Sequence, residues 1–97
     1  MIVNINEIEK IVLLLLSKLR ESKGNEIELT NDYYWDIDDD ELYNPYEKPK
    51  DIGLGQVSFD IELLLKLLNE PDDALPFHFK KLASILIALY ATNPILF

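Results

Sequence analysis

The residues with the most chemical potential in this 97-residue chain lie in one stretch, residues 32–49, which reads DYYWDIDDDELYNPYEKP. It holds five aromatic rings and seven carboxylates beside a single lysine. Aromatic rings give large contact areas at low entropic cost, and carboxylates steer and orient a basic partner. We therefore predict a partner-binding surface made of Tyr33, Tyr34, Asp36, Asp38, Asp39, Asp40, Glu41, Tyr43 and Tyr46. In the alternative interpretation the rings face inward as core and the acids are a solvated rim; a division of the two is also open, with Trp35 and Ile37 in the core and the acids and some tyrosines facing out.

The same stretch partly matches a calcium-binding loop. Counted from Asp36, a twelve-residue EF-hand loop would find oxygen ligands at its side-chain positions, namely Asp36, Asp38, Asp40, Asn44 and Glu47. Position six, where glycine makes the sharp turn, is Glu41. We therefore expect no metal site and no cofactor, and calcium binding remains the weakest alternative.

Residues that catalyse reactions in other proteins lack suitable neighbours here. The single histidine, His78, stands between two phenylalanines, which is typical of a structural or surface residue. No serine has a sequence context that indicates activation. The adjacent carboxylates Asp38–Asp40 are expected to be solvated alike, without the contrasting environments that acid–base catalysis needs. The sequence therefore predicts a protein that is not an enzyme.

The net charge of −9 belongs to the middle of the chain, because residues 25–60 carry eleven carboxylates and two lysines. Such a concentrated negative field repels phosphates and attracts basic surfaces. We therefore expect a basic protein as partner and no nucleic acid. The longest apolar run, residues 11–16, is too short to span a membrane, and the acidic start does not suit a signal peptide. With no cysteine present, a cytoplasmic location fits best.

Helical spacing of apolar residues predicts three helices. The first covers residues 4–23, with Asn4 or Asn6 as its cap and Gly24 after its last turn. Because this helix is apolar on nearly every side, we expect it to be central or covered by a second chain. Together with the apolar tail at residues 95–97, it predicts a homodimer.

The other two predicted helices are residues 58–69, capped by Ser58, and residues 76–92, with Pro76 in the first turn. Residues 25–57, between the first and second predicted helices, have no lasting period, and we expect an ordered acidic and aromatic wrap anchored by its rings. The predicted fold is one all-α domain, residues 1–97, with three up-down helices. A mixed α+β fold with a small hairpin near residues 26–37 is the alternative.

From Tyr33 to Asp60 the chain resembles a group of small, acidic, functionally uncharacterised bacterial proteins. The resemblance rests on a few short motifs: Tyr33–Ile37, Glu41–Tyr43, Pro49, Gly55–Gln56 and Asp60 before a leucine-rich helix. It implies a bacterial cytoplasmic domain and assigns no catalytic residue. In size and acidity the chain is also similar to bacterial toxin-immunity proteins, some of which place tyrosines among acids to block nucleases.

These features predict a non-enzymatic acidic protein-binding module, in its most concrete form an immunity-like or antitoxin-like antagonist of a basic bacterial protein. The alternative is a structural or assembly protein whose main interaction is with itself. Neither membrane binding nor a small-molecule cofactor is expected for either role.

Overall fold

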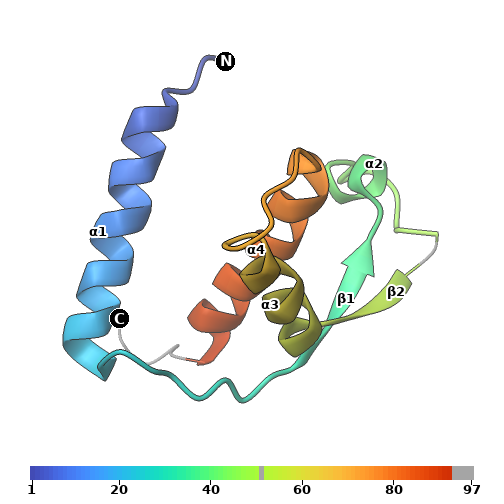
Figure 1. Ribbon diagram of the computed structural model, residues 1–97. Helices are drawn as coiled ribbons and strands as arrows, with labels where there is room; N and C mark the ends of the chain where they lie inside the picture. Colours follow the sequence, from blue (N-terminus) through green and yellow to red (C-terminus); the bar gives the residue numbers. More distant parts are fainter. Residues whose placement is uncertain (51, 93–97) are drawn as a thin grey trace.

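The computed structural model describes residues 1–50 and 52–92, except for the side chains of Asp39 and Thr92. The element order is α1 (Ile5–Lys23), β1 (Tyr33–Ile37), α2 (Asp39–Leu42), β2 (Ile52–Gln56), α3 (Val57–Lys66) and α4 (Leu75–Thr92) (Figure 1). The all-α prediction is wrong, because β1 and β2 form an antiparallel two-stranded sheet. The α+β alternative fits, with β1 inside the predicted region and its partner strand further along the chain.

The hairpin forms because β1 is rich in residues that favour strands, in the order Tyr-Tyr-Trp-Asp-Ile. The partner strand β2 was hidden by its two glycines, which weaken a strand and usually indicate turns. Gly55 is required here, since it faces Tyr34 in the register and a Cβ at this position would overlap the Tyr34 ring. The glycine pattern of residues 53–55, which resembles a turn, therefore belongs to strand β2, and Gly55 leaves space for the Tyr34 ring.

Helix α1 has the ends that the sequence predicts. The Asn4 side chain accepts a hydrogen bond from the Glu7 backbone N–H at 3.1 Å, and Gly24 follows the last turn with φ of 85°. No residue of α1 is buried, although the helix is apolar on nearly every side. In Figure 1 it stands apart from the other helices and is joined to β1 by an extended segment. Within residues 1–50 and 52–92 the chain therefore leaves most of α1 uncovered, with only Val12 and Leu19 half-buried.

Helices α3 and α4 pack against each other beside the hairpin (Figure 1). The α3 helix begins at Val57 and ends at Lys66, and α4 begins at Leu75. Ser58 does not cap α3, since it lies inside the first turn and its backbone N–H bonds to the carboxylate of Asp32 instead. The cap comes from a residue far away in the sequence.

The core is small. Among the described residues, the buried side chains are Val57 and Ala88, which are apolar, and Asp60 and Ser84, which are polar. All four belong to α3 and α4. In the described part of the chain no helix combines the length and apolar character needed to cross a membrane. The predicted apolar tail at residues 95–97 lies outside the described residues.

Candidate functional site

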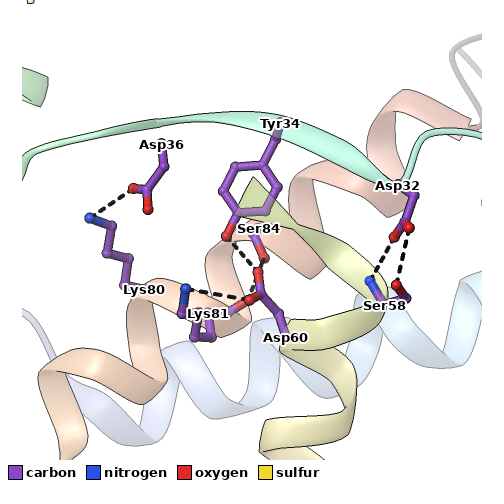
Figure 2. A network of polar contacts seen from close by, with 8 residues as sticks. All are labelled: Asp32, Tyr34, Asp36, Ser58, Asp60, Lys80, Lys81 and Ser84. Atoms are coloured by element: carbon purple, nitrogen blue, oxygen red, sulfur yellow. Dashed lines mark hydrogen bonds and ion pairs between the residues drawn. The ribbon is translucent and has the colours of Figure 1, made fainter. Parts of the chain in front are cut away.

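A buried carboxylate connects the hairpin to both long helices. Asp60 of α3 is 1% exposed, and its Oδ2 accepts hydrogen bonds from the Tyr34 hydroxyl at 2.5 Å and the Ser84 hydroxyl at 2.7 Å. The Lys81 ammonium lies 3.4 Å from its Oδ1. Figure 2 shows these groups converging from β1, α3 and α4. A charge this buried needs such partners, because an unpaired one would cost several kcal/mol, on the order of 3–5 when one partner is removed.

The Tyr34 hydroxyl acts as a hydrogen-bond donor in this network. Burial of the phenol and its hydrogen bond to Asp60 raise the pKa of Tyr34 to about 12, since both disfavour the phenolate. At neutral pH the hydroxyl is therefore protonated and donates to the carboxylate. Asp60 and Ser84 are both buried. The network therefore holds the hairpin on α3 and α4.

A second contact holds the same face of β1. Asp36, two residues after Tyr34, forms an ion pair with Lys80 of α4 at 3.0 Å (Figure 2). The Lys80 ammonium also donates to the Ile37 carbonyl oxygen at 3.4 Å. Residues two apart on a strand share a face, so Tyr34 and Asp36 both point toward the helices. Two of the predicted partner-binding residues are therefore engaged inside the molecule.

Asp32, just before β1, fixes the junction between β2 and α3. Its carboxylate accepts from the Ser58 backbone N–H at 2.7 Å, the Gln56 side chain at 2.8 Å and the Ser58 hydroxyl at 3.0 Å. The Gln56 hydrogen bond, followed by the Ser58 backbone bond, holds the pKa of Asp32 below its usual value. Sequence reasoning assigned Asp32 no structural role, and no local pattern reveals it, since its partners lie at the far end of the hairpin.

The other face of the hairpin points away from the helices. Tyr33, Trp35 and Ile37 lie on it, and the register places Leu54 opposite Trp35 and Ile52 opposite Ile37. Trp35 is 73% exposed and Leu54 is 66% exposed. We call these five residues the hairpin surface. The interpretation of Trp35 as core is wrong, and Ile37 is half-buried.

Beside the hairpin surface lies a cavity of about 520 Å³, which we call the α2 pocket. Its lining residues are Ile37, Glu41, Leu42, Asn44, Pro45, Tyr46, Glu47, Lys48 and Pro49. Ile37 belongs to both surfaces, so they are continuous. The Glu41 Oε1 accepts from the Lys50 backbone N–H at 3.1 Å, while its Oε2 is buried without a hydrogen-bond partner among the described residues. The pocket is thus lined by both apolar side chains, such as Ile37 and Leu42, and charged ones, with Glu41 and Glu47 beside Lys48.

Of the remaining predicted site residues, Tyr46 lines this pocket and the others are close to its lining residues in sequence. Asp38 caps the start of α2, and its carbonyl oxygen accepts from the N–H groups of Glu41 and Leu42. The side chains of Asp38, Asp40, Tyr43 and Tyr46 are exposed. The side chain of Asp39 lies outside the described part of the structure.

The geometry does not form a calcium loop. Asp36, the first position of that motif, lies in β1 and pairs with Lys80, and the following residues form the helical turn α2. Within residues 1–50 and 52–92, no three acidic or histidine side chains gather where they could hold a metal ion.

His78 has a local structural partner. Its Nε2 lies 2.6 Å from the Asp72 Oδ1, which also accepts from the Ala74 backbone N–H at 2.9 Å. The Ala74 bond, followed by the histidine, holds the pKa of Asp72 below its usual value. The pair ties the α3–α4 connection to the first turn of α4.

Comparison with protein-family models, with curated proteins and with solved structures finds no match to this chain. The resemblance of Tyr33–Asp60 to small acidic bacterial proteins therefore stays a prediction.

Proposed function

We propose that this protein is a non-enzymatic binding module that docks a basic protein on the hairpin surface and the α2 pocket. The observation that carries the proposal is the exposed cross-strand pair of Trp35 and Leu54 on a sheet whose other face is fastened to the helices. Binding energy in interfaces concentrates on aromatic side chains that are held in place before the partner arrives. The Asp60 network supplies that rigidity.

Charge gives the chemistry of the partner. Glu41 and Glu47 line the pocket, and the exposed Asp38 and Asp40 are next in sequence to its lining residues Ile37 and Glu41. An arginine or lysine side chain from the partner would pair with these carboxylates and bury its stem against Ile37 and Leu42. The acidic field of residues 25–60 would speed the encounter with such a partner.

An immunity-like or antitoxin-like antagonist of a basic bacterial protein is the form of this function that size and acidity support. Such antagonists act by covering a basic surface, which needs no catalytic group. The inaccessible Asp60 and Ser84 agree with a role without catalysis. A self-associating assembly protein is the second candidate, and the uncovered helix α1 favours it.

The test is affinity capture of basic proteins from a bacterial lysate at low salt, followed by calorimetry with each purified candidate. We expect Trp35→Ala to weaken the complex by more than about tenfold, as loss of a central aromatic anchor does. Asp38→Asn/Asp40→Asn should slow association several-fold, and Glu41→Gln should raise the dissociation rate. Added salt should also slow association, because at about 0.15 M the screening length is near 8 Å.

Matched controls separate the site from general surface effects. Phe79→Ala removes an exposed aromatic side chain from α4, and Glu70→Gln/Asp73→Asn removes the same charge as the double aspartate variant. Both should bind as the wild type does. Equal affinity of all variants, or capture of no basic protein, would refute the proposal.

A further inference from the structure

We propose that helix α1 is a self-association interface, in which two copies of the chain pair their α1 helices antiparallel. The seam is the stripe of Ile5, Ile8, Val12, Leu15 and Leu19, whose spacing of three and four is that of a coiled coil. Ile5 is 79% exposed and Leu15 is 59% exposed, whereas Val12 and Leu19 are half-buried in the single chain. Ile11 and Leu16, which flank the seam, are also exposed and widen it.

Charge decides the direction of pairing. Glu7 and Glu9 lie in the first half of α1, whereas Lys18, Arg20 and Lys23 lie in the second half. An antiparallel pair places the acidic half of each helix beside the basic half of the other, and the opposed helix dipoles agree with it. A parallel pair would place Lys18 beside Lys23 of the second copy.

The pairing register follows from the seam. Val12 stands opposite Leu15 of the second copy, and Ile8 stands opposite Leu19. On one side of this seam Glu7 then comes within about two residues, or 3 Å along the axis, of the level of Lys18 in the second copy. On the other side Glu9 does the same with Arg20. Of the remaining charges of the helix, Lys23 lies four residues after Leu19 at the end of the seam stripe, whereas Lys10 and Glu21 fall on the face away from the seam.

A groove at the end of α1 extends this interface. Its volume is about 280 Å³, and its apolar lining comes from Leu16 and Leu19 of α1, Ile27 and Leu29 of the linker, Ile61 of α3, and Ile85 and Leu89 of α4. In the antiparallel register the residues that precede the second copy's α1 reach this level. Those residues include Ile2 and Val3, which are exposed in the single chain. The apolar lining of the groove therefore complements the exposed apolar side chains of Ile2 and Val3 in the second copy.

This interface is separate from the proposed binding surface. Figure 1 places α1 on the opposite side of α3 and α4 from the hairpin, so a dimer leaves Trp35 and the α2 pocket open. Loss of self-association would therefore leave the binding of a basic protein in place, and the two proposals fail independently.

Sedimentation equilibrium of the whole chain gives the first test. We expect a dimer of the 11.3 kDa chain at micromolar concentration. Val12→Glu/Leu15→Glu should yield a monomer with unchanged α3, α4 and hairpin, whereas Lys10→Ala/Glu21→Ala on the outer face should remain dimeric. A monomeric wild type would overturn the proposal.

Cysteine cross-linking tests the direction, since the chain has no cysteine of its own. Ile5 stands opposite Ser22 of the second copy, so a mixture of Ile5→Cys and Ser22→Cys chains should form a disulfide-linked dimer under mild oxidation. Each variant alone should not, because its two cysteines would lie about 26 Å apart, at 1.5 Å for each of seventeen residues. Cross-linking of either variant with itself would establish a parallel pair and refute the antiparallel one.

Discussion

Tyr34 and Gly55 are direct cross-strand partners, and the Tyr34 ring fills the space that a Cβ would occupy at position 55. The absence of a side chain on β2 lets the ring lie across the strand, and its hydroxyl reaches Asp60 on α3 at 2.5 Å. One glycine therefore permits the hydrogen bond that holds the inner face of the hairpin on the helices.

Gly55→Ala should destabilise the fold. The added methyl group must displace the Tyr34 ring, and overpacking of this kind costs about 1–3 kcal/mol. The free energy of unfolding from urea denaturation measures the effect. Gly53→Ala is the control, since a Cβ there meets Asp36 at 3.6–3.7 Å, an ordinary contact distance. Equal stability of the two variants would contradict the packing argument.

Tyr34→Phe should reduce the sensitivity of stability to alkaline pH. The folded protein raises the pKa of Tyr34 from 10.0 to about 12, so between these values the unfolded chain loses this proton first. Wild-type stability is then lost progressively as pH rises from 10 toward 12, and the variant lacks this contribution. Urea denaturation at neutral and alkaline pH compares the two. Parallel pH profiles would show that the hydroxyl is not held by Asp60.

The same substitution has a spectroscopic signature. Of the five tyrosines, Tyr34 should ionise late in an absorbance titration of the folded protein, and that late component should disappear in Tyr34→Phe. Tyr46→Phe, which changes an exposed ring beside the α2 pocket, should leave the late component in place.

Local signals in the sequence predicted the ends of α1 well, because Asn4 and Gly24 act within one turn of the helix they delimit. The hairpin was not predicted as the main fold, since β2 has glycines for reasons that only Tyr34 explains. Asp60 resembles an ordinary acidic residue in the first turn of a helix. Its burial depends on Tyr34, Ser84 and Lys81. These partners are more than twenty positions away, so the sequence around Asp60 does not predict them.

The candidate site was predicted in part. Alternation along β1 separates Trp35 from Tyr34 and Asp36, but the sequence alone does not say which face meets the helices. The structure places Trp35 outward and fastens the other two inward. The α2 pocket escaped prediction because its lining forms only when residues 37–49 fold back on themselves.

Asp32→Asn should destabilise the protein at neutral pH while keeping the size of the side chain. The folded state lowers the pKa of Asp32 below 3.8, so its stabilising effect is present above that value and is lost as pH falls through the folded pKa. The stability difference between wild type and variant should therefore shrink in acid. Thermal melts from neutral to acidic pH follow it. Asp40→Asn, which changes an exposed aspartate in α2, should show no such difference at either pH.

Trp35→Ala should leave stability nearly unchanged. Its ring is 73% exposed, and surface substitutions of this kind usually change the unfolding free energy by less than about 0.5 kcal/mol. In the free protein, acrylamide should quench the single tryptophan efficiently, and a docked basic partner should protect it. A loss of several kcal/mol on substitution would mean that the ring packs in the core.

The cap of α3 by Asp32 has a consequence for the order of folding. Asp32 and Ser58 are 26 positions apart, so the first turn of α3 gains its acceptor only after the intervening chain has closed. Closing such a loop has an entropic cost that local contacts do not repay, which makes it a slow step. We expect the hairpin and α3 to appear together in a folding experiment, with amide protons that exchange as one unit. Helix α1, which depends on no such closure, should open and exchange by itself.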